Sequence, residues 1–241
     1  MSETYGNDRR FVTGLVSIII PVYNERESLE ELFQRVERVS LGKEIILIDD
    51  GSTDGTRDIV ARLGDENRAR VHLMPKNQGK GMAVRRGLEM ARGEVCITQD
   101  ADLEYDPAEI PEVAGPILAG VADVCYGSRN LGGNDVRSSF AFYWGGRLVS
   151  WLTTLLFLVH VTDETTGYKA FRTELLCQIP LRGRRFELEP ELTAKVMRRG
   201  LRYKEVPISY HPRKFSQGKK IRWWDGVAAL WTLLVWRILP F

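Results

Sequence analysis

Residues 16–25 read Val-Ser-Ile-Ile-Ile-Pro-Val-Tyr-Asn-Glu, and residues 44–50 read Glu-Ile-Ile-Leu-Ile-Asp-Asp. Each stretch is an apolar run, rich in β-branched side chains, that ends in polar residues. Between the two runs an apolar pattern with spacings of three and four predicts an amphipathic helix, with Leu29, Leu32, Phe33, Val36 and Val39 on one face. Two buried strands joined by a helix are typical of a parallel sheet with both faces covered.

The same alternation continues along the chain. Short apolar runs at 71–74, 95–98 and 123–126 predict strands, and the segments 59–63, 81–91 and 107–118 predict helices. The sequence therefore predicts an α/β protein with a mostly parallel sheet of at least five strands, flanked by helices. Ligands of such sheets bind outside the carboxyl ends of the strands, so the residues that follow each strand form the candidate site.

Composition and motifs exclude several classes of protein. The 241 residues have a formal net charge of +2, and 44% of them are hydrophobic, which indicates a globular chain and gives no sign of nucleic-acid binding. No Gly-x-Gly-x-x-Gly follows the first strand and no P-loop motif occurs, which argues against dinucleotide enzymes and P-loop NTPases. Three separated cysteines suggest neither disulfides nor a zinc site. Residues 1–14 are expected to form a polar tail without the pattern of a signal peptide, so we expect no secretion.

Pairs of carboxylates end two of the predicted strands. Asp100 and Asp102 are two residues apart, so in an extended segment both carboxylates point to the same side and can share a cation. Asp49 and Asp50 end a second strand, and like charges gathered at one sheet edge need a cation to offset them. Hard oxygen ligands suit Mg²⁺ or Mn²⁺, and Glu104 is a third candidate ligand.

The first strand ends in residues that suit a nucleotide. The carboxylates of Glu25 and Asp50 can accept paired hydrogen bonds from a base edge or a ribose diol, and Tyr23 can stack on a base. A second interpretation is structural: Asn24 caps the following helix, with Glu27 as its capping-box partner. Both interpretations can hold together.

The basic residues gather in one part of the chain. Residues 182–222 carry thirteen Lys and Arg against four Asp and Glu, so this part is expected to face anions. Lys195, Arg198, Arg199 and Arg202 fall on a predicted helix, and we interpret them as a solvated basic face.

Two charge-free apolar stretches, 148–159 and 226–236, are shorter than the ~20 residues that span a bilayer. Their tryptophans favour helices that lie in a membrane interface, at 140–161 and 223–241, and the alternative is a core helix and a docking helix. The second helix is predicted to be amphipathic, with an apolar stripe of Trp224, Val227, Leu230, Trp231 and Leu234.

Five motifs in this order resemble the family 2 glycosyltransferases with the GT-A fold: 16–25 (VSIIIPVYNE), 44–56 (EIILIDDGSTDGT), 77–81 (NQGKG), 100–102 (DAD) and 127–129 (GSR). Three later segments are similar to the branch of dolichyl-phosphate and polyprenyl-phosphate mannose and glucose synthases: 163–172 (DETTGYKAFR), 186–191 (FELEPE) and 205–213 (EVPISYHPR), continuing to Gly218-Lys-Lys220. The resemblance covers residues 15–222 and implies one GT-A domain over that range.

The resemblance also implies roles for single residues. Nucleotide-contact positions are matched by Pro21, Tyr23, Glu25, Ile48 and Asp50, and the donor and metal motif by Asp100, Ala101 and Asp102, with Glu104 as a further ligand. Positions that hold phosphates are matched by Arg129, Arg213 and Lys219, and Asp102, Arg129 and Arg213 are expected to act at the reacting groups. Candidates for the acceptor phosphate are Arg129, Arg137, Ser138 and Arg147, although the chain departs from the family pattern between Gly132 and Arg147.

The resemblance, taken with the apolar, Trp-rich stretches, implies an enzyme that moves a hexose, with inversion, from GDP-mannose or UDP-glucose to a polyprenyl phosphate at the cytoplasmic face of a membrane, as a peripheral protein. A phosphate monoester is largely anionic at neutral pH, so it can attack without a general base. What the protein must supply is positive charge, from a metal ion and from Arg and Lys. One alternative is a member of the same family with a hydroxyl acceptor, and an alternative of another class is a non-catalytic membrane or nucleic-acid adaptor.

Overall fold

The predicted apolar runs form five strands of a seven-stranded sheet in the computed structural model, which describes residues 11–131, 140–213 and 223–241, the side chains of 140–143 and 223 excepted. The strands are β1 (Val12–Val22), β2 (Lys43–Asp49), β3 (Arg70–Leu73), β4 (Gly93–Thr98), β5 (Val124–Ser128), β6 (Lys169–Arg172) and β7 (Tyr203–Pro207). Their order is β3-β2-β1-β4-β6-β5-β7, and β6 runs antiparallel to both of its neighbours while the other pairs are parallel. The prediction of a mostly parallel sheet is therefore confirmed.

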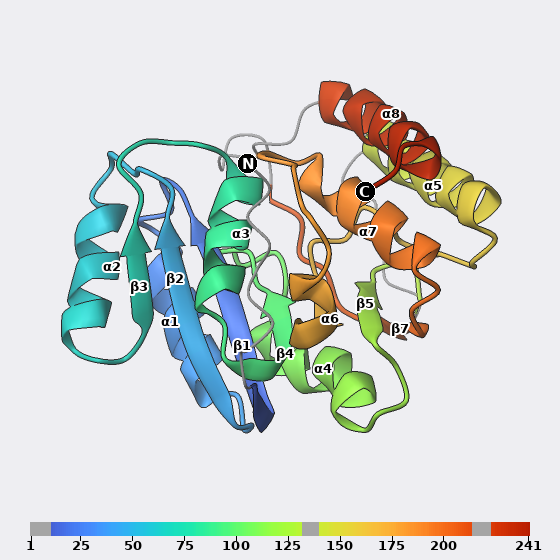
Figure 1. Cartoon of the computed structure of the whole chain (residues 1–241). Coiled ribbons are helices and arrows are strands. Elements are labelled where there is room, and N and C mark those ends of the chain that lie inside the picture. Colours follow the sequence, from blue (N-terminus) through green and yellow to red (C-terminus); the bar gives the residue numbers. More distant parts are fainter. Residues whose placement is uncertain (1–10, 132–139, 214–222) are drawn as a thin grey trace.

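Helices cover both faces of this sheet (Figure 1). The helices α1 (Leu29–Arg38), α2 (Thr56–Asp65) and α4 (Ile110–Leu118), the last preceded by a 3₁₀ turn at Pro107–Glu109, contribute side chains to the core on one face. The helices α3 (Lys80–Met90), α6 (Thr173–Cys177) and α7 (Leu188–Arg198) contribute to the core on the other. Alternate residues of β1 face these two cores, because side chains of a strand point to opposite faces in turn: Ile18 and Ile20 lie in the first, Ile19 in the second.

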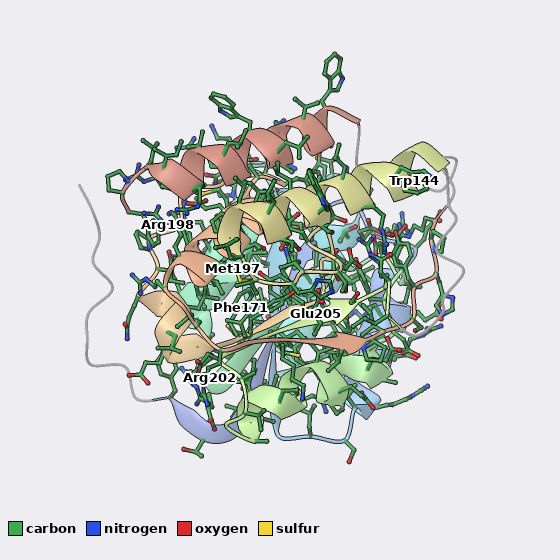
Figure 2. All side chains as sticks on the ribbon, turned by 90° about the vertical axis from the view of Figure 1, so that its right-hand side faces the viewer. Trp144, Phe171, Met197, Arg198, Arg202 and Glu205 are labelled. Atoms are coloured by element: carbon green, nitrogen blue, oxygen red, sulfur yellow. The ribbon has the colours of Figure 1, made fainter. Side chains whose placement is uncertain are left out.

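Two further helices, α5 (Phe140–Phe157) and α8 (Trp223–Ile238), lie side by side on the outer side of α7 (Figure 1). Their inner faces share a small apolar core with α7 that includes Val149, Ala194 and Leu233. Their outer faces are exposed, and Figure 2 shows their side chains projecting from this side of the molecule. The exposed large apolar residues on this face are Trp144, Leu148, Trp151, Leu155, Leu158, Trp224, Val227, Trp231, Leu234, Ile238 and Leu239. We call them the apolar face.

The predicted stripe on the C-terminal helix lies on this side: Trp224, Val227, Trp231 and Leu234 are exposed, and Leu230 is half-buried. Within the described ranges, neither α5 nor α8 nor any other helix is long and apolar enough to cross a membrane.

Two structural expectations are wrong. Asn24 does not cap the first helix: α1 begins at Leu29 with Ser28 in the capping position, and the Asn24 side chain accepts a hydrogen bond from the Thr53 amide instead. Asn24 is in the left-handed region at φ 50°, which its short polar side chain tolerates. The chain thus makes a turn before α1, and the turn is held against the end of β2.

The second is the expectation that Lys195 lies on a solvated face; Arg198, Arg199 and Arg202 are exposed, as expected. Lys195 is fully buried and paired with Glu191, whereas Arg202 lies beyond the helix and pairs with Asp123. Arg198 donates to the Trp236 carbonyl of α8 at 2.7 Å. Figure 2 shows Arg198 near α8 and Arg202 well away from it, at the other side of the sheet. Lys195 therefore does not belong to a solvated face, and Arg198 and Arg202, although exposed, have partners within the protein.

Candidate active site

The site is a cavity of ≈ 490 Å³ at the carboxyl ends of β1, β2 and β4. It has the size of an ordinary small-molecule site. The predicted residues that line it are Pro21, Tyr23, Glu25, Asp50, Asp100, Ala101, Asp102, Glu104, Arg129 and Arg213. The parallel arrangement explains this gathering, because it brings the ends of separate strands to one edge of the sheet.

The other predicted site residues lie elsewhere. Ile48 is fully buried in the core beneath α3, so its side chain does not reach the cavity. Arg147 is exposed on α5, outside the set of residues that line the cavity. Lys219, Arg137 and Ser138 lie outside the described residues.

Asp50 shapes the loop that precedes α3. Its two carboxylate oxygens accept hydrogen bonds from the amides of Gln78 (2.7 Å) and Gly79 (2.8 Å). Burial raises the pKa of Asp50, and these two amides oppose that effect. Residues 77–81 carry the third motif and line the cavity through Asn77, Gly79 and Lys80. We call them the donor loop, after the role that we propose for them.

Carboxylates concentrate negative charge at the end of β4. Burial, together with Asp100 and Glu104, raises the pKa of Asp102 to about 7. A bound cation would offset this repulsion among the carboxylates. Both carboxylate oxygens of Glu104, however, already have partners: they accept hydrogen bonds from the Tyr210 hydroxyl (2.7 Å) and the Arg213 amide (2.8 Å). Among the described residues no group of three or more His, Cys, Asp or Glu is spaced to hold a metal ion, so the three-ligand set stays a prediction.

A row of charged side chains leads from the cavity into the protein, from the half-buried Asp100, Lys80 and Glu189 to the fully buried Lys169. The Lys80 ammonium lies 2.6 Å from Asp100 and 3.6 Å from Glu189, and Glu189 lies 3.1 Å from Lys169. Burial alone would lower the pKa of Lys80, but Asp100 and Glu189 hold it well above its usual value. Burial likewise favours a neutral Glu189, but the two lysines keep its pKa low. The row is therefore charged, and it fixes Asp100 from the side of α3 and α7.

Sequence reasoning gave no role to Lys80 and Lys169. The signal for Lys80 was its position inside the motif 77–81, directly before the predicted helix 81–91. Lys169 gave no such signal, because it lies in a strand and its partners are set by the packing of α7 on the sheet.

Arg213 joins three strand ends. Its guanidinium binds one Glu25 oxygen through both terminal nitrogens, each at 3.0 Å, and donates through Nε to the Asp102 carbonyl at 2.5 Å. Its own amide donates to Glu104. Arg213 follows β7 in the sequence but lies at the ends of β1 and β4, so it closes the cavity on that side.

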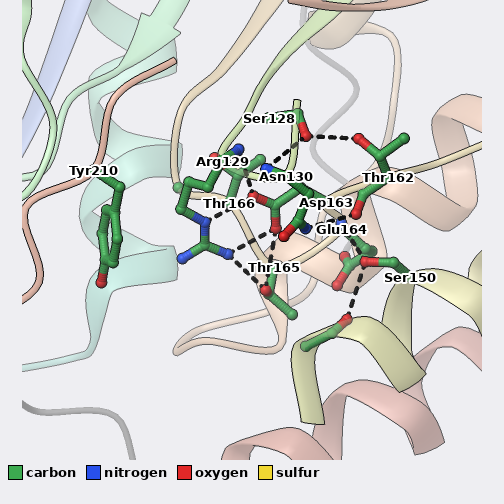
Figure 3. A network of polar contacts seen from close by, with 12 residues as sticks. Ser128, Arg129, Asn130, Ser150, Thr162, Asp163, Glu164, Thr165, Thr166 and Tyr210 are labelled. Atoms are coloured by element: carbon green, nitrogen blue, oxygen red, sulfur yellow. Dashed lines mark hydrogen bonds and ion pairs between the residues drawn. The ribbon is translucent and has the colours of Figure 1, made fainter. Parts of the chain in front are cut away.

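Arg129 is held in a fixed orientation by Asp163 (Figure 3). The Arg129 Nε and Nη2 atoms lie 2.7 Å from the two Asp163 oxygens, the backbone amide of Arg129 lies 2.9 Å from the same carboxylate, and Nη2 also donates to Thr165. The guanidinium lies over the Tyr210 ring at 5.0 Å. Figure 3 shows one terminal nitrogen pointing away from this network, on the side of Tyr210. Paired geometry of this kind fixes a guanidinium for binding an oxyanion.

The seven-stranded sheet, with its cavity at the carboxyl ends of the strands, has the GT-A fold of glycosyltransferases. The family model for glycosyl transferase family 2 matches residues 17–178, and the chain belongs to this family. Over 210 residues it is 32% identical to the dolichol-phosphate mannosyltransferase of Pyrococcus furiosus, covering 85% of this chain and 58% of that protein. It is 33% identical to the polyprenol monophosphomannose synthase of Mycolicibacterium smegmatis, covering 84% of this chain and 79% of the relative.

The fold is also found in solved structures. The glucosyl-3-phosphoglycerate synthase of Mycobacterium tuberculosis, solved with Mn²⁺ and UDP, superimposes with a TM-score of 0.71 at 22% identity, covering 94% of this chain and 81% of that one. This likeness supports the GT-A fold, which the sequence predicted.

Proposed function

We propose that this protein transfers a hexose, with inversion, from a nucleoside-diphosphate sugar to a polyprenyl phosphate, while its α5 and α8 helices rest on a membrane. The observation that carries the acceptor class is the apolar face, nine exposed large apolar side chains on two adjacent helices and two more, Leu158 and Leu239, directly after them. Exposed apolar patches of this extent mark interaction surfaces. A water-soluble acceptor would not require one. The names of the two mannosyl-transferring relatives support the same class.

The donor binds, in this proposal, across the ends of β1, β2 and β4. Tyr23 faces the nucleotide, Glu25 holds Arg213 beside it, and the donor loop presents the N-terminus of α3, where backbone amides favour an anionic group. Asp50 orders this loop through two hydrogen bonds to its amides. Lys80 places a positive charge in the same region and keeps Asp100 in one position.

A divalent cation, Mg²⁺ or Mn²⁺, fits the negative charge at Asp100 and Asp102 and, when bound, would offset the charge of the leaving diphosphate. Asp102 has no lysine or arginine side chain paired to its carboxylate among the described residues, and Asp100 is held by Lys80. Glu104 would have to leave Tyr210 to act as a ligand, so we assign it the role of holding Tyr210 and Arg213.

The acceptor phosphate meets Arg129 in this proposal. Asp163 and Thr165 fix the guanidinium so that it does not have to reorganise when an anion arrives. The phosphate monoester carries its own negative charge at neutral pH, with a second pKa near ~6, and attacks the anomeric carbon without a general base. Arg129 and Arg213 thus reduce the repulsion between an anionic acceptor and an anionic donor.

The test is a transfer assay with purified protein, Mg²⁺ or Mn²⁺, a short polyprenyl phosphate, and GDP-mannose or UDP-glucose in separate reactions. We expect a glycolipid product from one of the donors, and none from a hydroxyl acceptor such as 3-phosphoglycerate. Asp102→Asn should abolish transfer, whereas Asp106→Asn should not, because Asp106 caps the 3₁₀ turn and Asn caps equally well. Product from the hydroxyl acceptor alone would overturn the acceptor class, and an active Asp102→Asn would overturn the site.

A further inference from the structure

The donor loop is packed against a second loop, residues 182–185, without room for a side chain. A Cβ atom on Gly79 would lie 2.5 Å from the Arg184 carbonyl oxygen, and one on Gly81 would lie 2.7 Å from the Arg184 carbonyl carbon. The Met82 amide at the start of α3 donates to the same Arg184 carbonyl at 3.0 Å. Because backbone meets backbone here, a shift of residues 182–185 moves the donor loop with it.

Glu191 of α7 holds the second loop in place. Its carboxylate is almost fully buried and accepts hydrogen bonds from the amides of Arg182 (2.9 Å) and Gly183 (2.5 Å). The buried ammonium of Lys195, one helical turn away, pairs with this carboxylate and also donates to the Pro180 carbonyl. The loop is thus attached to α7 through the buried Glu191–Lys195 pair, and also through Glu187 at the start of the helix, which accepts hydrogen bonds from the amides of Arg184 (3.0 Å) and Arg185 (3.2 Å). The buried pair must stay paired because an isolated buried charge is strongly unfavourable.

The indole ring of Trp236 in α8 covers this ion pair. The Lys195 ammonium lies 3.6 Å from the centre of the Trp236 ring, and the Arg182 guanidinium lies 5.4 Å from it. These distances allow cation–π contact with both groups. Trp236 is 8% exposed and lies on the inner side of α8, whereas Trp231, on the same helix, is 67% exposed on the apolar face.

We propose that Trp236 is a positioning residue for the donor site: it keeps the Lys195–Glu191 pair dry, and Glu191 in turn holds residues 182–185 against the donor loop. The helix whose outer side forms the apolar face therefore sets the nucleotide affinity through its inner side. This inference rests on the proposed function in one respect, that residues 77–81 bind the donor.

The experiment compares two tryptophans of one helix. Nucleotide affinity is measured by titration calorimetry with GDP and with UDP, each in the presence of Mn²⁺, and donor KM and kcat with a short-chain acceptor. We expect Trp236→Ala to weaken nucleotide binding and raise the donor KM by about tenfold, as coupled neighbours in one network do, with kcat changed far less. Trp231→Ala should leave the nucleotide affinity unchanged, and Trp236→Phe, which restores a ring over Lys195, should recover most of the affinity.

Each outcome decides the inference. Equal nucleotide affinity in wild type and a folded Trp236→Ala overturns it, as does an equal loss in Trp231→Ala, which would indicate a general effect of α8. Thermal melting reports whether each variant is folded. If Trp236→Ala does not fold, Glu191→Gln carries the same test, because it keeps the shape but not the charge, and unchanged affinity there overturns the inference. Nucleotide binding is read without a lipid acceptor, so a protein that binds nucleotide but does not glycosylate polyprenyl phosphate refutes the proposed acceptor and leaves this inference intact.

Discussion

Replacement of Trp231 by alanine tests the apolar face directly. Trp231 is 67% exposed, which corresponds to roughly 170 Å² if the whole residue offers about 250 Å². At about 25 cal/mol per Å², complete transfer of this surface from water would contribute about 4 kcal/mol. An interfacial helix buries its apolar side only in part, so we take about half, or about 2 kcal/mol. Trp231→Ala should therefore weaken binding to liposomes by about thirtyfold.

The assay is flotation or sedimentation with liposomes of mixed neutral and anionic lipids, over a range of lipid concentrations. Valine offers a matched control: Val227 on α8 is 55% exposed and Val121, in the turn between α4 and β5, is 60% exposed. Val227→Ser should weaken liposome binding and Val121→Ser should not. Equal binding of wild type, Trp231→Ala and Val227→Ser would refute the membrane role of the apolar face. Point substitutions are preferable to removal of residues 223–241, because truncation would also uncover Lys195.

Two further substitutions test the fold and the acceptor half of the site. Gly87→Ala should destabilise the protein in urea unfolding, because its Cβ would lie 2.3 Å from a methyl carbon of Ile19. Gly115→Ala in α4 meets no atom within 4 Å, so it should stabilise the protein by about 1 kcal/mol. A Gly87→Ala variant as stable as Gly115→Ala would contradict the packing of α3 on β1. Asp163→Asn should lower transfer by tenfold or more while nucleotide binding is kept, because Arg129 loses its paired charge; transfer at the wild-type rate would show that Arg129 does not need this orientation.

The sheet was predictable because its signals are local. Uninterrupted apolar runs such as 16–20 and 44–48 predict strands covered on both faces, and each became a central strand. The antiparallel strand β6 was not predicted, because Lys169-Ala-Phe-Arg172 is four residues long and begins and ends with a charge. Its place between β4 and β5 depends on pairing with strands far away in the sequence.

Residue type predicted chemistry better than it predicted environment. Lys195 was assigned to a solvated face because lysine is almost never fully buried without a partner. Its partner Glu191 is four residues earlier on the same helix, a spacing typical of an exposed pair as well. What decides between the two is the covering ring of Trp236, 41 residues later, and no local pattern reports a contact at that separation.

The candidate site shows the same division between local and distant contacts. Asp50 and Asp102 follow strands, so the sheet alone brings them to one edge. The bond between Arg213 and Glu25 joins residues 188 positions apart, and the resemblance gave both a ligand-binding role without pairing them. In this structure they bind one another.

A donor that uses either Glu25 or Arg213 must compete with the other side chain, so we expect Glu25→Gln to free Arg213 for phosphate and to change donor affinity far less than Arg213→Gln. Calorimetry with GDP or UDP and Mn²⁺ measures this, and equal losses in the two variants would mean that Glu25 contacts the nucleotide as directly as Arg213 does.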